Sequence, residues 1–232
     1  MVRTFQEQIA LSAIIPTLNE AASLPRTVAA LRPTAMLREI IVADGGSSDE
    51  TIAVAGAAGA RVVGAAPGRG AQLAAGAAAA AGDWLLFLHA DCRLERGWED
   101  AVRAFVCAPK AADRAGYFDL ALDDPAPAAR RLERIVAWRC RWLALPYGDQ
   151  GLLIARSLYD EVGGFPPLPL MEDVELVCRL GRRRIARIGA RSIASARRYR
   201  RDGYWRSSLR NISCLGLYFA GVPPERIRRL YR

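Results

Sequence analysis

His89 and Asp91 are the residues of this chain whose types and spacing first suggest chemistry. Five consecutive apolar residues, 84–88, precede them, which predicts a buried strand covered on both faces, as in a parallel α/β sheet. Ligands of such sheets bind beyond the carboxyl ends of the strands. We therefore predict a strand over 84–91 whose end points both side chains the same way, where they could share a divalent cation or a nucleotide phosphate. The alternative for His89, the single histidine, is a structural role in the core.

Further polar residues follow other predicted strands. Asp44 precedes two glycines, which is common turn chemistry, but its carboxylate would also suit a nucleotide base or ribose. Asp49 is best interpreted as a helix cap, since a short helix begins just after it. Asn19 and Glu20 could likewise be only the cap and first turn of a helix.

Two helix starts carry the remaining candidates. Arg69 lies between two glycines, where backbone N–H groups and a guanidinium could approach a diphosphate. The loop lacks the spacing of a P-loop or a dinucleotide fingerprint, so an ordinary helix-start turn is the favoured alternative. Glu172 and Asp173 open an amphipathic helix, where acids are stabilised by the helix dipole. A carboxylate there could also act as a general base toward an acceptor hydroxyl.

The elements that would position these residues alternate between strand and helix. Strands are expected near 9–15, 39–43, 61–64 and 84–91, with helices up to 31, over 51–58 and over 70–81. This alternation predicts right-handed crossovers and a Rossmann-like half, with all its loops on one edge of the sheet. Further along we expect helices near 97–107, 130–145, 171–180, 204–218 and 223–231, and strands near 115–122, 152–155 and 184–188.

Composition limits the class of protein. The 232 residues suffice for one catalytic-sized α/β domain, and no apolar run is long enough to span a bilayer. With no signal-peptide pattern and five scattered cysteines, which we expect to be reduced, the sequence predicts a cytoplasmic protein. The net charge of +9 is concentrated in arginines over 179–210 and at the end of the chain. That basic part suggests an anionic membrane surface or a polyanionic substrate, whereas no nucleic-acid motif is present.

Taken in order, the motifs resemble those of family 2 glycosyltransferases of the GT-A fold. The matching segments are residues 14–20 (IIPTLNE), 39–49 (EIIVADGGSSD), 68–70 (GRG), 82–91 (GDWLLFLHAD), 163–165 (GGF) and 172–176 (EDVEL). The forms DGGS, LHAD and GDQG are similar to a narrower bacterial subgroup, labelled transferase 2 and associated with radical-SAM and selenoprotein-type domains. The resemblance covers roughly residues 9–190, and its specificity comes from order and spacing.

The resemblance implies a nucleotide diphosphate sugar as donor and gives each candidate a role. Asp91 matches the last acid of the family's Asp-x-Asp motif and would hold Mn²⁺ or Mg²⁺ on the diphosphate, while Asp173 matches the catalytic base, with Glu172 beside it. The residues implied to lie at the nucleotide are Pro16, Asn19, Glu20, Asp44, Arg69 and His89. His89 replaces the first acid of Asp-x-Asp, Gly45 replaces the second acid of the common Asp-Asp-Gly-Ser form, and Ala75 stands where relatives often carry asparagine.

We therefore expect an inverting, metal-dependent glycosyltransferase. Its GT-A domain would span residues 1–203, with a nucleotide-binding half over about 1–95 and an acceptor half over about 96–203, followed by a helical appendage over 204–232. The arginine-rich and aromatic end predicts peripheral contact with the inner face of the membrane and a lipid-linked or amphipathic acceptor. The alternatives are a sugar-phosphate nucleotidylyltransferase, which the missing N-terminal glycine-rich loop disfavours, and a non-catalytic basic protein that binds a membrane surface.

Overall fold

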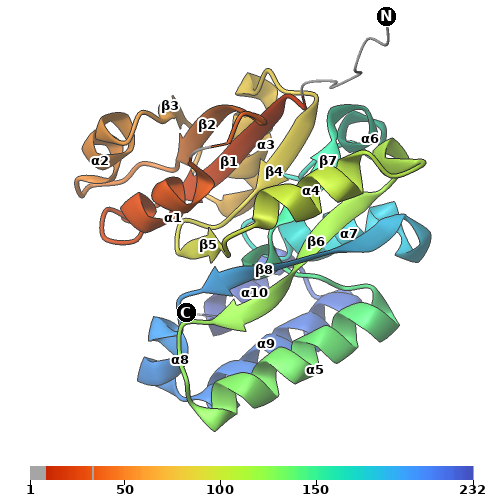
Figure 1. Ribbon diagram of the computed structural model, residues 1–232. Coiled ribbons are helices and arrows are strands. Elements are labelled where there is room, and N and C mark those ends of the chain that lie inside the picture. Colours follow the sequence, from red (N-terminus) through yellow and green to blue (C-terminus); the bar gives the residue numbers. More distant parts are fainter. Residues whose placement is uncertain (1–8, 33, 232) are drawn as a thin grey trace, which may run out of the picture.

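A curled, mixed sheet of eight strands runs through the computed structural model, which describes residues 9–32 and 34–231 (Figure 1). The strand order is β3-β2-β1-β4-β7-β6-β8-β5. The strands are β1 (Leu11–Thr17), β2 (Leu37–Asp44), β3 (Arg61–Gly64), β4 (Trp84–Phe87), β5 (Cys92–Leu94), β6 (Ala115–Leu122), β7 (Leu152–Ala155) and β8 (Ile185–Ala194). Helices cover the sheet, which confirms the predicted α/β, GT-A-like class.

The first half of the sheet is parallel, as predicted. β1 pairs with β2 and β4, and β2 pairs with β3, while helices α1 (Leu24–Leu31), α2 (Thr51–Ala57) and α3 (Arg69–Ala79) form the crossovers. Every residue of β1 is buried, as is every residue of β4. A strand covered on both faces favours apolar side chains at nearly every position, which explains why these runs do not alternate. The polar exceptions in β1, Ser12 and Thr17, donate to Glu39 and Asp44.

The second half of the sheet mixes directions. β7 lies antiparallel to β4, β6 lies antiparallel to β7, and β8 lies parallel to β6. β5 closes the far edge by pairing antiparallel with β8, although it follows β4 by only a short turn. The chain therefore crosses from the first half to the far edge immediately after β4, and residues 88–91 lie between the two halves.

Three expectations are corrected by the structure. The strand predicted over 84–91 ends at Phe87, because the N–H of Cys92 donates to the carbonyl of His89 and turns the chain. The last strand begins at Ile185 as expected but continues to Ala194 through its long pairing with β6. Neither β5 nor the short helices α6 (Arg156–Glu161) and α8 (Arg197–Asp202) were anticipated.

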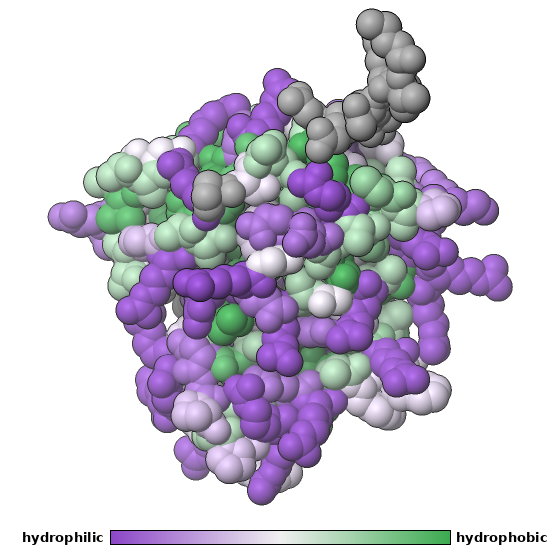
Figure 2. Space-filling view, in the orientation of Figure 1, coloured by the Kyte–Doolittle hydropathy of each residue, from purple (hydrophilic) through white to green (hydrophobic). Residues whose placement is uncertain are grey.

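The remaining helices include two that lie side by side below the sheet, α5 (Pro127–Leu143) and α9 (Tyr204–Phe219) (Figure 1). The others are α4 (Trp98–Val106), α7 (Glu172–Leu180) and α10 (Pro224–Tyr231), with 3-10 turns η1 (Ala111–Asp113), η2 (Gly148–Gln150) and η3 (Arg182–Arg184). Hydrophilic side chains cover most of the face seen in Figure 2. Within the described residues, no helix is both long and apolar enough to cross a membrane. The five cysteines form no disulfide.

Candidate active site

The loops after β1 and β2 are held together by side-chain hydrogen bonds. Asn19, with a positive φ of 58°, accepts from the N–H groups of Ser48 and Asp49 through Oδ1. In return the N–H of Asn19 donates to the hydroxyl of Ser47, and that of Glu20 donates to the hydroxyl of Thr51. Asparagine adopts a left-handed backbone more readily than most residues. The hydrogen bonds of Asn19 thus hold the loop after β1 against the loop after β2.

Asp44 ends β2 with its carboxylate turned into the protein. Its oxygens accept from the hydroxyl of Thr17 at 3.0 Å, from the N–H of Gly46 at 3.0 Å and from the N–H of Ser47 at 2.8 Å. Burial by itself would raise the pKa of Asp44, but the hydrogen bonds from Ser47, Thr17 and Gly46 outweigh it and lower the pKa. The turn role considered from the sequence is present, and contact with a nucleotide base stays a prediction.

Two neighbours of this loop explain sequence features. Pro16 lies within β1, paired in register with Ala43 of β2. Gln72 of α3 is buried and donates to the carbonyls of Thr17 and Ala43. A Cβ on Gly45 would lie 2.8 Å from Gln72 Nε2. Gln72 therefore fills the space beside Gly45.

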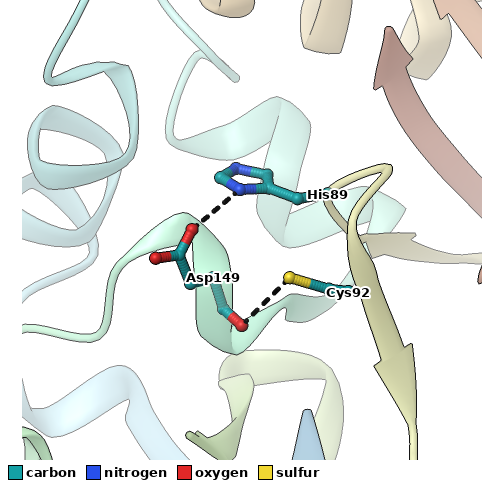
Figure 3. A group of neighbouring side chains, drawn as sticks. All are labelled: His89, Cys92 and Asp149. Atoms are coloured by element: carbon teal, nitrogen blue, oxygen red, sulfur yellow. Dashed lines mark hydrogen bonds and ion pairs between the residues drawn. The ribbon is translucent and has the colours of Figure 1, made fainter. Parts of the chain in front are cut away.

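The centre of the site is the pair His89 and Asp149 (Figure 3). His89 Nδ1 lies 3.0 Å from Asp149 Oδ1, and Nε2 lies 3.3 Å from Nη1 of Arg69. The contacts assign the hydrogen to Nδ1, which donates to Asp149, while Nε2 accepts from the arginine. A carboxylate that binds one ring nitrogen fixes the tautomer and orients the other nitrogen, as in metal-binding histidines.

The electrostatics of the pair follow from these contacts. Burial would lower the pKa of His89, but the hydrogen bond to Asp149 raises it, against the opposing charge of Arg69. Burial opposes the charge on Asp149 as well, yet the hydrogen bond from His89 and the charges of Arg198 and Arg69 hold its pKa well below the usual range. Asp149 is therefore ionised at neutral pH.

Arg69 links the pair to α7. Its Nε lies 2.9 Å from Oε1 of Glu172, whose side chain is 1% exposed. Burial raises the pKa of Glu172, the charge of Arg69 lowers it, and the neighbouring Asp173 raises it. Gly70 makes this approach possible, because a Cβ there would lie 2.1 Å from the carbonyl oxygen of Pro166. The start of α3 and the loop before α7 thus pack in direct backbone contact.

Asp173 faces the same cleft from the start of α7. Its Oδ2 accepts from the N–H of Gly148 at 2.8 Å, and the cleft is lined by Arg69, Asp149 and Arg198 as well. A Cβ on Gly148 would lie 2.3 Å from His89 Nε2. The structure therefore brings together His89, Arg69, Glu172 and Asp173, which the sequence predicted from three separate segments.

Asp91 lies in the turn after β4 with its side chain exposed. Its Oδ1 accepts a hydrogen bond from the thiol of Cys92, with 3.7 Å between the oxygen and the sulfur. Loss of hydration next to the protein and the negative charge of Asp149 raise the pKa of Asp91. Burial also raises the pKa of Glu20, and the charge of Asp91 adds to that increase. Asp91 is thus repelled by both Asp149 and Glu20, an arrangement that a bound cation stabilises.

The donor set fits a hard divalent cation only in part. Ligand atoms of His89, Cys92 and Asp149 all lie within 4.8 Å of one another (Figure 3). Cys92 is buried, which raises its pKa well above the usual range, and its thiol donates to the Asp149 carbonyl. Manganese and magnesium prefer oxygen and imidazole ligands to thiol. The carboxylates of Asp91 and Asp149 are therefore the suitable groups, whereas His89 Nε2 already contacts Arg69.

Sequence reasoning missed Asp149 as a site residue, although its GDQG segment was noted. Gln150, 1% exposed, anchors this turn by donating to the Phe118 carbonyl and accepting from Cys140 and Arg139. The hydroxyl of Ser192 also donates to the carbonyl of Asp149. The signal was available as an acid in the short segment GDQG, but its partner His89 is 60 positions away.

The match to a family model decides what kind of protein carries this site. Residues 12–165 match the model described as glycosyl transferase family 2. The chain belongs to glycosyl transferase family 2. It is thus a glycosyltransferase, as the motifs predicted. The search of curated proteins returned no match.

Solved structures agree on the fold. Glucosyl-3-phosphoglycerate synthase from Mycobacterium tuberculosis, in complex with Mn²⁺ and UDP-glucose, is 21% identical with a TM-score of 0.62, covering 92% of this chain and 80% of that one. TarS from S. aureus, residues 1–349, is 15% identical with a TM-score of 0.61, covering 95% and 69% respectively. These similarities confirm the GT-A fold.

Proposed function

We propose that the protein transfers a sugar from a nucleotide diphosphate sugar to an acceptor hydroxyl with inversion at the anomeric carbon. The observation that carries the proposal is that Asp173, Arg69 and Asp149 line one cleft although they come from different elements. His89 contacts both Arg69 and Asp149 beside it. The family assignment favours this reaction over a nucleotidylyltransferase and over a non-catalytic basic protein. That the similar mycobacterial enzyme was solved with Mn²⁺ and UDP-glucose supports a nucleotide sugar and a divalent cation here.

In the proposed reaction Asp173 accepts the proton of the acceptor hydroxyl. The oxygen then forms a bond to the anomeric carbon as the bond from that carbon to the diphosphate breaks, and the diphosphate leaves with the electron pair. Glu172 holds Arg69 toward the cleft, so that its guanidinium contacts the diphosphate. Asp149 holds His89 in one orientation.

A divalent cation bound at Asp91 would supply Lewis-acid stabilisation of the departing diphosphate. Asp149 and Glu20 place further negative charge near Asp91, which favours a bound cation there. We assign the nucleotide to the adjoining strand ends, where Asn19 is exposed and Pro16 and Asp44 are buried just beneath it.

The finer assignments belong to the same proposal. The nucleotide-binding half covers about residues 1–95, the acceptor half about 96–203, and the helical appendage 204–232; residues 1–8 lie outside the described range. On the sequence forms DGGS, LHAD and GDQG we also assign the chain to the narrower transferase 2 subgroup.

Contact with a membrane at the cytoplasmic face is also proposed. Of the eleven large apolar side chains that are exposed in the described chain, four lie on α5, four on α9 and one on α10. Arginines alternate with them along the same helices. Exposed tryptophan and leucine beside arginine are typical of helices that lie in an anionic membrane interface.

Liposome flotation tests the membrane contact. Wild-type protein should float with vesicles that contain phosphatidylglycerol, and replacing the exposed Trp138 and Trp142 by serine should reduce the floated fraction. The control is Ile52→Ser, which removes an exposed side chain of α2. Equal flotation of the tryptophan variant and the control would show that this surface does not contact the membrane.

A donor screen tests the enzymatic proposal. Purified protein is incubated with common UDP-, GDP- and dTDP-sugars and with Mn²⁺, Mg²⁺ or EDTA, and nucleotide release is measured. We expect hydrolysis of one donor, dependent on metal and lost in Asp91→Ala. Pyrophosphate release from a nucleoside triphosphate, with every sugar donor left intact, would instead identify a nucleotidylyltransferase.

A further inference from the structure

A groove of about 300 Å³ separates α5 from α9. Its walls are mainly apolar. The side chains that form them are Leu132, Ile135 and Val136 on α5 and Trp205, Leu209, Ile212 and Leu215 on α9, with Leu120 at the floor. Its size is that of a small-molecule site.

Several apolar side chains along the groove are exposed to water, although closer packing of α5 and α9 would bury them. Ile135 is 59% exposed, Leu209 58%, Ile212 64% and Trp205 79%. Fully burying one such aliphatic side chain stabilises a protein by about 1.5–3 kcal/mol. A contiguous apolar surface that the fold leaves open is typical of a binding site for an apolar ligand.

The inner end of the groove opens into the candidate active site. Tyr147, Asp149, Asn211 and Leu215 line both the groove and the cleft that contains Asp173. Arg139 stacks on the ring of Tyr147, 3.6 Å from its centroid, and so fixes one side of this junction. A ligand in the groove would therefore extend directly toward the proposed catalytic base.

A polar atom without a partner marks the same junction. Oδ1 of Asn211 is buried and accepts no hydrogen bond from the described residues. An unsatisfied buried acceptor costs about 1–3 kcal/mol, which a hydroxyl donor at this point would recover. Arg198 also lines the cleft, where its guanidinium is suited to a phosphate.

We propose that the groove binds the hydrocarbon chain of an amphipathic acceptor, whose polar head enters the cleft at Asp173. This inference rests on the proposed function and specifies its acceptor as a molecule with a single apolar chain. The chain lies between α5 and α9, and Asn211 accepts a hydrogen bond from the head. The acceptor hydroxyl then reaches Asp173 while the apolar part stays out of water.

Calorimetric binding of dodecyl phosphate below its micellar concentration tests the groove, with butyl phosphate as the short-chain comparison. Ile135→Glu and Leu209→Glu place a charge on each wall at exposed positions, so folding should be retained. The matched control is Leu143→Glu, because Leu143 is an exposed residue of α5 outside the groove. Thermal unfolding of each variant verifies that it folds.

We expect the wild type and Leu143→Glu to bind dodecyl phosphate equally, and the two groove variants to bind at least tenfold more weakly. Equal binding by all variants, or equal affinity for the butyl and dodecyl compounds, would overturn the proposal. Binding of UDP with Mn²⁺ is measured on the same samples. If the protein binds dodecyl phosphate more tightly than butyl phosphate but does not bind UDP, the proposed function is refuted and the groove still binds an apolar chain. If it binds UDP but binds both alkyl phosphates equally, only the proposal for the groove is refuted.

Discussion

The backbone N–H of Gly148 donates to Oδ2 of Asp173 across 2.8 Å, although the two residues are 25 positions apart. This bond joins the turn that carries Asp149 to the helix that carries the proposed base. Because Gly148 also lies against the His89 ring, the spacing of the whole cleft depends on the small size of this one residue.

Replacing Gly148 by alanine should disturb that spacing. The new Cβ would lie 2.3 Å from His89 Nε2, and such overpacking costs about 1–3 kcal/mol. We expect urea denaturation to show a loss of this size, together with weaker binding of Mn²⁺. The control is Gly56→Ala in α2, where a Cβ meets nothing within 4 Å and alanine should stabilise the helix by about 0.5–1 kcal/mol. Equal stability of Gly148→Ala and the wild type would contradict the described packing.

The variant Asp173→Asn tests the proposed base. Asparagine keeps an oxygen for the Gly148 N–H but cannot take a proton, so sugar transfer should fall about 100- to 10,000-fold. Nucleotide binding, followed by calorimetry, should be retained because Asp173 is assigned to the acceptor side. Asp160→Asn, at an exposed position on α6, is the control. Full transfer activity in Asp173→Asn would show that Asp173 is not the catalytic base.

His89→Asp replaces the imidazole by a carboxylate and should increase the stabilisation of the folded protein by Mn²⁺. Without metal, a new carboxylate beside Asp149 and Asp91 adds repulsion and lowers the unfolding midpoint. With Mn²⁺ the midpoint should rise more than in the wild type, since ligands that bind the native state stabilise it by mass action. His89→Asn, which adds no charge, is the comparison. The same Mn²⁺-dependent rise in all three proteins would show that position 89 does not bind metal.

Asp44→Asn should reduce stability in a pH-dependent way. The pKa of Asp44 is lowered in the folded protein, so its contribution is present above the unfolded value of about 3.9 and is lost as the pH falls through the folded value. Asparagine cannot accept all of the hydrogen bonds from Thr17, Gly46 and Ser47, and we expect a loss of about 1–3 kcal/mol at pH 7.

The same pair of proteins should converge in acid. Unfolding by urea from pH 7 to pH 2 should show the stability gap between the wild type and Asp44→Asn narrowing as Asp44 becomes protonated. A gap that stays constant over this range would mean that the Asp44 carboxylate does not carry the stabilisation.

Local patterns allowed the first half of the fold to be predicted, because the largely buried strands β1, β2 and β4 appear as nearly continuous apolar runs. β3 contains no buried residue and is a shorter run. The strands at 11–17, 37–44, 61–64 and 84–87 were all found near their expected places. β5 was missed because a three-residue strand has no detectable period and is held by pairing with β8, about a hundred positions later. The helices α6 and α8 are each six residues long, too short to show a helical period in the sequence.

The site was partly predictable for the same reason. Glu172 and Asp173 open a recognisable helix, and His89 ends an apolar run, so each could be proposed from its own segment. The contacts between them depend on Gly70 and Gly148, which permit two close approaches that only the folded chain reveals. The role of Asp149 is likewise a long-range one, set by His89 on one side and Ser192 on the other.

The central claim is that the cleft binds a nucleotide diphosphate sugar through a divalent cation at Asp91. Calorimetric titration of the wild type with the donor identified in the screen, with and without Mn²⁺, measures this directly, with Asp91→Ala and the exposed-site control Asp113→Ala alongside. We predict metal-dependent binding by the wild type and Asp113→Ala and at least tenfold weaker binding by Asp91→Ala. Metal-independent binding, or equal affinity in Asp91→Ala and the wild type, would contradict the claim.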